Sequence, residues 1–180
     1  RGAGTGVVGA GTATITARQA SSANYEAGSE SLTVQIGRAT PTLSSFSAIS
    51  KDYGDAPFTL TPPESDSPAP FTYESSNPSV ASINASTGVV TIRNVTAVGS
   101  PVTLTVRQAQ TDNYAAITAT TTLIIGRGTP VFGDFAILTK VWGASAFSAT
   151  APTSTSAGAF TYNIVDVDGV NEAAIATITS

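Results

Sequence analysis

The chain of 180 residues contains no cysteine, no histidine and no methionine, and only 11% of its residues are charged. The absence of cysteine excludes a disulfide framework and thiol chemistry. The absence of histidine removes the imidazole base and the commonest zinc ligand. The 12 carboxylates show no pairing by spacing of the kind that glycoside hydrolysis requires. We therefore expect no catalytic residue, no enzyme activity and no resident cofactor apart from the candidate calcium ion discussed below.

Basic charge is scarce as well. Eight Lys and Arg residues stand against 12 Asp and Glu residues, which gives a net charge of −4 and an isoelectric point near 4.5. This balance disfavours nucleic acids and anionic membranes as partners. No run of 18 apolar residues is present, so the sequence predicts no membrane insertion.

What the sequence does contain is a repeat with a period of 89 residues. The segment Gly37-Arg38-Ala39-Thr40-Pro41 recurs as Gly126-Arg127-Gly128-Thr129-Pro130. A self-similarity at a fixed period identifies tandem structural units. The same offset joins Arg18-Gln19-Ala20 to Arg107-Gln108-Ala109, and Phe71-Thr72-Tyr73 to Phe160-Thr161-Tyr162.

The repeated junctions predict three parts. Residues 1–37 are the back part of one unit, residues 38–126 a complete unit, and residues 127–180 the front part of a further unit. Two arrangements remain open. Either the chain is a window of a longer array of units, or each terminal part is completed by the complementary part of an identical neighbouring subunit. Both arrangements predict a filament.

Apolar runs and turn signals alternate through the complete unit. Short strands are expected around Phe58, Phe71, Val80, Val89, Val102 and Ile117, after an opening segment at Leu43 to Ile49, and Pro-, Gly- and Asn-rich segments separate them. No window has a helical period. About seven short strands with turn signals at roughly 8–12 residue spacing predict a two-sheet antiparallel sandwich. Two further strands are expected in the first part, over residues 12–19 and 31–36.

Several phrases of the sequence resemble bacterial Ig-like repeats. They are Tyr53-Gly54-Asp55-Ala56-Pro57-Phe58, the SSNPSVA phrase from Ser75 to Ala81, the segment from Thr87 to Ile92, and the GTATITA phrase from Gly11 to Ala17. The resemblance covers the complete unit and both terminal parts. It implies an all-β chain of tandem Ig-like antiparallel sandwiches of about seven strands each.

Such repeats occur in large secreted adhesins and in phage or viral surface fibres. The resemblance therefore implies a structural module of a long fibre on a cell or virion surface, acting as an extracellular stalk that supports attachment. Only about five residues join one unit to the next, so the units are expected to stack end to end as a rod. Its partners would be neighbouring repeats or identical subunits. The alternative is an adhesin module that itself binds a carbohydrate or a host receptor.

One loop departs from the repeat. It is six residues longer in the third unit than in the second, and it carries Asp166, Asp168 and Asn171. These three residues are candidate calcium ligands, because Ca²⁺ takes six to eight oxygen ligands. The EF-hand pattern is incomplete, and a solvated acidic loop between strands is the competing interpretation.

The remaining polar and aromatic candidates have structural interpretations. Asp52 and Asp55 are expected to form a turn. Tyr25 and Tyr114 are expected to pack the loop between the last two strands of their units. Trp142 takes the place of Tyr53 in the third unit and is expected in a core or in packing between domains.

Overall fold

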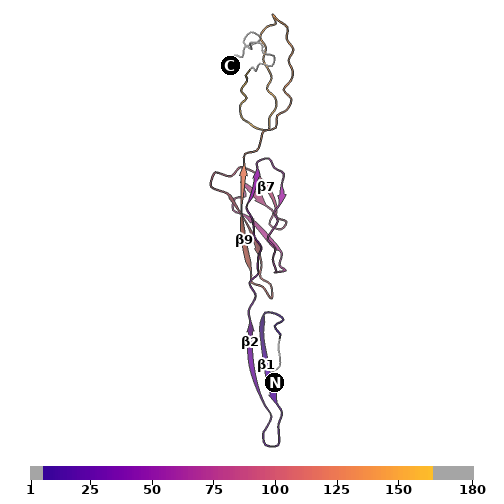
Figure 1. Cartoon of the computed structure of the whole chain (residues 1–180), viewed down its shortest axis with the longest axis vertical. Coiled ribbons are helices and arrows are strands. Elements are labelled where there is room, and N and C mark those ends of the chain that lie inside the picture. Colours follow the sequence, from indigo (N-terminus) through magenta and orange to yellow (C-terminus); the bar gives the residue numbers. More distant parts are fainter. Residues whose placement is uncertain (1–5, 164–180) are drawn as a thin grey trace. The chain divides into compact units, whose positions relative to one another are not determined.

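The computed structural model describes residues 6–163. These residues form nine β-strands and no helix, and among them no segment has the length and hydropathy of a membrane-spanning helix. The chain divides into two compact units, Arg1–Gly128 and Thr129–Ser180, which are described separately (Figure 1).

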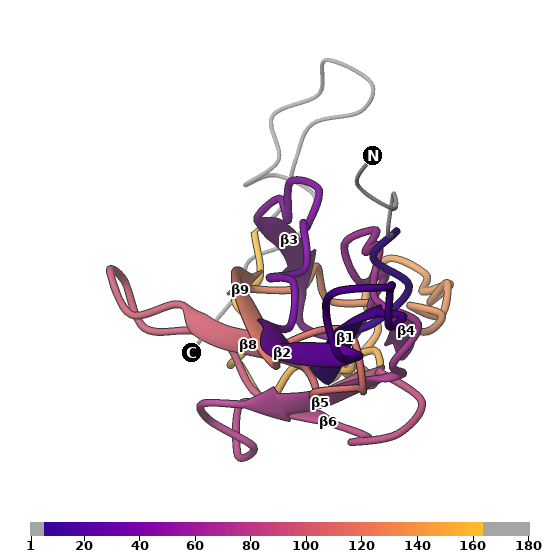
Figure 2. The ribbon, with the colours of Figure 1, turned by 90° about the horizontal axis from the view of Figure 1, so that it is seen from below.

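A two-layered sandwich occupies most of the first unit. Its larger sheet has the strand order β3-β9-β8-β5 and its smaller sheet the order β4-β7-β6 (Figure 2). This division is that of Ig-like domains, so the all-β sandwich predicted from the sequence is confirmed. The strands are β3 (Ile49–Asp52), β4 (Phe58–Thr59), β5 (Phe71–Ser75), β6 (Ala81–Ile83), β7 (Val89–Ile92), β8 (Val102–Gln108) and β9 (Ile117–Gly126).

One pairing departs from the antiparallel prediction. β3 runs parallel to β9, with Ile49 opposite Leu123 and Asp52 opposite Gly126. The first strand of the sandwich therefore pairs with the last one instead of with β4, the next strand along the chain. All other strand pairs among the described residues are antiparallel.

The core follows from side-chain alternation along β8 and β9. Successive side chains of a strand point to opposite faces, so every second residue faces the other sheet. Val102, Leu104 and Val106 of β8 are each at most 2% exposed, as are Leu123 and Ile125 of β9. Leu60, Ala81 and Val90 complete the core, and Phe46, Phe58, Phe71 and Tyr73 pack against it.

A two-stranded hairpin precedes the sandwich. β1 (Gly11–Gln19) and β2 (Gly28–Ile36) pair antiparallel, from Gly11 opposite Ile36 to Gln19 opposite Gly28. Both predicted strands are confirmed, and β2 begins three residues earlier than expected. With the offset of 89 residues, β1 and β2 are the counterparts of β8 and β9.

The described part of the second unit, residues 129–163, contains an isolated bridge between Phe132 and Ser154. The equivalent bridge in the sandwich joins Leu43 to Ser65. The Nζ atom of Lys140 lies 5.2 Å from the ring centroid of Phe147. Lys51 and Phe58 have the same separation, 5.2 Å. The front part of the unit therefore forms the same local contacts in both copies.

Candidate assembly surfaces

The peptide that enters the sandwich is held by the loop between β8 and β9. Arg38 Nε donates to the carbonyl oxygen of Thr111 at 2.8 Å. The backbone N–H of Ala39 donates to the carbonyl of Asn113, and that of Ala115 donates to the carbonyl of Ala39, both at 2.8 Å. Three hydrogen bonds thus fix residues 38 and 39 on the sandwich, so this junction is not a free linker.

The peptide that leaves the sandwich is held by the turn after β3. The N–H of Tyr53 donates to the carbonyl of Gly126 at 3.0 Å. The N–H of Asp55 donates to the carbonyl of Asp52, and the N–H of Asp52 to Asp55 Oδ2, both at 3.1 Å, so the predicted turn role of the two aspartates is confirmed. A Cβ atom at Gly128 would overlap the carbonyl oxygen of Tyr53, so only glycine fits against this turn.

A buried glutamine organises the Pro-rich loop between β4 and β5. Gln108, at the end of β8, is only 3% exposed. Its Oε1 accepts a hydrogen bond from Ser65 Oγ at 2.7 Å. Its Nε2 donates to the carbonyls of Ser67 and Ala69, at 3.2 and 2.6 Å. One side chain therefore satisfies three polar groups, as burial requires. The sequence marked this position as repeated but gave no sign of its role.

The same loop has the same internal turns in the second unit. In the sandwich, the N–H groups of Ser67 and Ala69 donate to the hydroxyls of Ser65 and Ser67, at 3.1 and 3.4 Å. In the second unit, Ser156 and Gly158 donate to the hydroxyls of Ser154 and Ser156, at 3.0 and 3.2 Å. The counterpart of Gln108 is Gln19 at the end of β1, where it is exposed.

A carboxylate near the start of the sandwich shows a shifted pKa. Asp66 Oδ1 accepts from the backbone N–H of Thr42, and Asp66 Oδ2 accepts from the Thr42 hydroxyl, both at 2.9 Å. These two bonds, the backbone one first, hold the pKa of Asp66 below its ordinary value. In the second unit, Thr155 stands at this position, and its hydroxyl accepts from the N–H of Val131 at 3.0 Å.

The apolar side chains outside the sandwich are largely exposed. Ile15 is 42% and Leu32 63% exposed. Leu104, the counterpart of Ile15, is fully buried. In the second unit, the side chains more than half exposed include those of Val131, Phe132, Phe135, Ile137, Val141 and Phe147.

Two aromatic residues differ from expectation. Tyr25 is 80% exposed, so its predicted packing is wrong, whereas its counterpart Tyr114 is half-buried. Tyr114 is held because its N–H donates to Thr111 Oγ1 at 3.0 Å, in the loop that grips Ala39. Trp142 is fully exposed, because it lies on the turn between Val141 and Ala144, so its predicted place in the core of its unit is wrong, and packing between domains stays a prediction.

The candidate calcium ligands Asp166, Asp168 and Asn171 lie outside the described residues, and the calcium site stays a prediction. Within residues 6–163, no three Asp, Glu, His or Cys side chains gather in a way that would hold a metal ion. The ion pair between Arg107 and Glu74, at 3.1 Å, lies on the exposed face of the larger sheet.

No protein-family model and no curated protein matches the chain. Solved structures of protocadherin extracellular regions are similar to it. The protocadherin gamma B4 extracellular domain is 18% identical, with a TM-score of 0.34, over 59% of this chain and 21% of that one. The cis-dimer structure of protocadherin gamma B7 EC3-6 is 16% identical, with a TM-score of 0.35, over 69% of this chain and 35% of that one.

The chain thus spans well under half the length of either protocadherin structure. The strand order and pairing of the sandwich define it as an Ig-like β-sandwich. The bacterial family to which the sequence is similar stays a prediction.

Proposed function

We propose that this chain is a structural repeat module of a long extracellular fibre, on a cell or a virion surface, where it acts as a stalk that supports attachment. It performs no catalysis and works through its neighbours, which are further repeats or identical subunits. The observation that carries the proposal is the repetition of one structural unit at an offset of 89 residues, with the same local contacts in successive copies.

The junctions support a stalk rather than a flexible tether. Residues 38 and 39 are hydrogen-bonded to the β8–β9 loop, and Gly126 is hydrogen-bonded to the turn at Tyr53. A peptide held at both ends of each sandwich restricts bending between units, whereas a Gly/Ser-rich linker would leave them free. The modest negative charge suits a solvated surface structure.

The test is to remove one period from the native polypeptide. Deleting residues 38–126 joins Gly37 to Arg127 and so recreates the repeated junction. In immunogold electron microscopy of the intact cells or particles, the fibre should become shorter by one unit. This is roughly 40 Å, because a strand of about six residues rises about 3.3 Å per residue and the loops extend both ends of the sandwich. Attachment should persist. An unchanged fibre, or labelling found only inside the cell, would refute the stalk.

The second candidate is an adhesin module that binds a carbohydrate or a receptor. The exposed side chains of Trp142 and Tyr25 favour it, since aromatic rings stack on sugars and anchor interfaces. They belong to different units, however, and Phe46, Phe58, Phe71 and Tyr73 pack on the core. Binding of the whole chain on a glycan array, lost in Trp142→Ala or Tyr25→Ala, would favour this candidate over the stalk.

A further inference from the structure

The hairpin β1–β2 presents one face of an Ig-like core. Shifted by 89 residues, Ala13, Ile15 and Ala17 correspond to Val102, Leu104 and Val106, which are at most 2% exposed in the sandwich. All nine residues of β1 are exposed. On the adjacent strand, Leu32, Val34 and Ile36 correspond to Thr121, Leu123 and Ile125, which are buried.

The second unit carries the counterparts of side chains that pack against this core. Phe132 and Phe160 lie with ring centroids 5.9 Å apart, and Phe135 and Tyr162 lie 6.3 Å apart. Their counterparts in the sandwich are Leu43, Phe71, Phe46 and Tyr73, of which the three aromatic residues pack against the core that β8 and β9 supply. Each part of the chain therefore carries the apolar surface that would cover the other.

A polar contact is divided between the same two parts. In the sandwich, Gln108 enters the Ser65–Ala69 loop and makes three hydrogen bonds there. The second unit carries the loop from Ser154 to Gly158 with its turns already formed. The hairpin carries the glutamine, Gln19, at the exposed end of β1. The binding groups are thus present in advance, which lowers the cost of ordering them.

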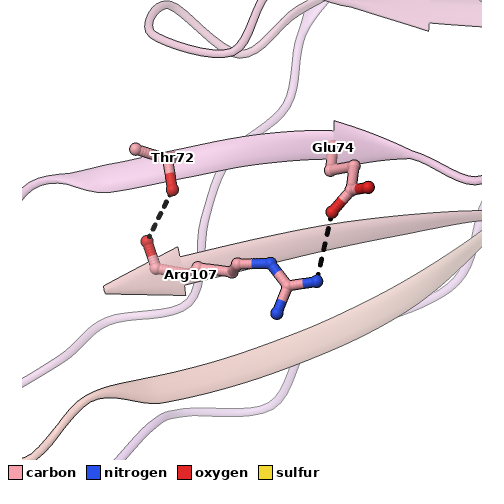
Figure 3. Close-up of polar contacts among 3 residues, drawn as sticks. All are labelled: Thr72, Glu74 and Arg107. Atoms are coloured by element: carbon pink, nitrogen blue, oxygen red, sulfur yellow. Dashed lines mark hydrogen bonds and ion pairs between the residues drawn. The ribbon is translucent and has the colours of Figure 1, made fainter. Parts of the chain in front are cut away.

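The pairing of β5 with β8 in the sandwich predicts the register in which the hairpin and the second unit would pair. In the sandwich, β5 pairs with β8 antiparallel, with Thr72 opposite Arg107 and Tyr73 opposite Val106. Figure 3 shows the outer face of this pair: Thr72 Oγ1 donates to the Arg107 carbonyl at 3.3 Å, and Arg107 Nη2 donates to Glu74 Oε2 at 3.1 Å.

The equivalent residues retain these groups. Thr161 replaces Thr72, and Arg18 replaces Arg107. Asn163 replaces Glu74, and its amide oxygen can accept a hydrogen bond from an arginine as the carboxylate does. The register places Thr161 opposite Arg18 and Tyr162 opposite Ala17.

We propose that the hairpin β1–β2 of one copy of this chain pairs with residues 129–163 of a second copy, so that the two parts form the counterpart of the β3-β9-β8-β5 sheet and copies join head to tail. A second copy can act as the partner because its residues 129–163 carry the matching register, apolar side chains and glutamine-binding loop. A head-to-tail contact of this kind builds an open chain of subunits. The inference rests on the proposed role of the chain as a fibre repeat.

The test measures association of the whole chain by analytical ultracentrifugation. The native chain should form a concentration-dependent series of oligomers. Ile15→Asp, on the core-facing side of β1, and Tyr162→Asp, in the opposite part, should each weaken association at least tenfold. The control, Thr14→Asp, adds the same charge one residue away on the other face of β1 and should associate as the native chain does.

A mixture of the two defective variants distinguishes head-to-tail pairing from other association. Ile15→Asp keeps an intact front part, and Tyr162→Asp keeps an intact hairpin, so only one contact can form between them. The mixture should therefore give a 1:1 dimer and nothing larger. Oligomers that persist in both variants, or a mixture that stays monomeric, would overturn the proposal.

A crosslink provides a readout that does not depend on these variants. The chain contains no cysteine, so Ala17→Cys with Tyr162→Cys introduces the only two thiols. Directly opposed antiparallel residues have Cα atoms about 4.5–5.5 Å apart, which suits a disulfide. Oxidation should give a ladder of covalent oligomers. A crosslink within one chain, or none, would overturn the second copy as partner.

The proposed stalk function and the proposed pairing of copies can be refuted separately. If deletion of residues 38–126 shortens the fibre while the native chain stays monomeric at about 100 μM, the hairpin is covered by a covalently linked repeat and the stalk stands alone. If the copies associate but no surface fibre is found, pairing holds and the stalk fails.

Discussion

Asp66 and Thr155 occupy equivalent positions in the two units, and each accepts the same kind of backbone hydrogen bond. Both side chains accept a hydrogen bond from the backbone N–H at the start of their unit, Asp66 from Thr42 and Thr155 from Val131. The carboxylate depends on ionisation and the hydroxyl does not. The two units are therefore expected to differ in their response to acid.

Replacing Asp66 by threonine should reduce the loss of unfolding free energy that occurs at acid pH. The pKa of Asp66 is lowered in the folded chain, so its contribution is present above the pKa of the unfolded state, about 4, and is lost as the pH falls through the folded value. Asp66→Thr keeps the bond to the backbone of Thr42. Denaturant unfolding between about pH 6 and pH 2 should show a shallower slope than in the native chain, and equal slopes would contradict the assigned role.

The buried Gln108 side chain should contribute substantially to the free energy of unfolding, although it is polar. Gln108→Leu should lower the free energy of unfolding by roughly 2–3 kcal/mol, because the Ser65 hydroxyl and the carbonyls of Ser67 and Ala69 lose their buried partner. Gln19→Leu, at the exposed equivalent position, should change it by less than about 0.5 kcal/mol in dilute solution. Urea titration followed by circular dichroism measures both, and equal losses would contradict the network.

The sequence predicted these residues only in part. The repeated Arg-Gln-Ala phrase marked Gln19 and Gln108 as equivalent positions, but the role of Gln108 depends on a loop about 40 residues earlier in the chain. The core position predicted for Trp142 was wrong, because an aromatic residue is buried only where a partner surface covers it. The turn role of Asp52 and Asp55 was predictable, because Asp is a local turn former.

At the scale of elements, the turn between β6 and β7 depends on one glycine. Asn84 Oδ1 accepts from the N–H groups of Ser86 and Thr87, at 3.0 and 2.9 Å, and Gly88 completes the turn with a φ of +70°. The ring of Tyr73 lies over Gly88, so a Cβ atom there would be 3.0 Å from Tyr73 Cζ. The turn and the packing of β5 are therefore coupled.

Gly88→Ala should cost more than backbone strain alone. A left-handed φ costs a side-chain-bearing residue roughly 1–2 kcal/mol, and displacement of the Tyr73 ring should add about 1 kcal/mol. Gly99→Ala is the matched control, because its φ is +74° and a Cβ atom there would meet nothing within 4 Å. The difference in unfolding free energy between the two variants measures the ring contact, and no difference would show that Tyr73 adjusts freely.

The strands themselves were predictable because their alternation and turn residues are local signals. β1, β2 and the strands β4 to β9 lie where apolar residues alternate and Pro, Gly or Asn interrupt them, whereas β3 shares only Ile49 with the predicted opening segment. The parallel pairing of β3 with β9 was not predictable, since it joins segments about 74 residues apart and leaves no local pattern. Pairings of that kind are set by the packing of the whole domain.

At the scale of the whole molecule, the period of 89 residues made the tandem organisation visible in the sequence. The offset required no knowledge of the fold, because both copies of each phrase are in the chain. The partner surfaces became visible only when exposed residues of β1 were compared with the buried residues of β8. Such a comparison needs three-dimensional burial, which a repeat pattern does not contain.

The pairing of β3 with β9 determines how the sandwich responds to mechanical tension. A pull on its two ends draws these parallel strands in opposite directions along their length, so their hydrogen bonds are sheared together instead of being broken one after another. With cysteine handles at Gly37 and Arg127, optical tweezers should record a higher unfolding force than with handles at the directly opposed residues Thr72 and Arg107, which unzip β5 from β8. In the proposed stalk, such a repeat would resist the drag that flowing liquid exerts on the fibre.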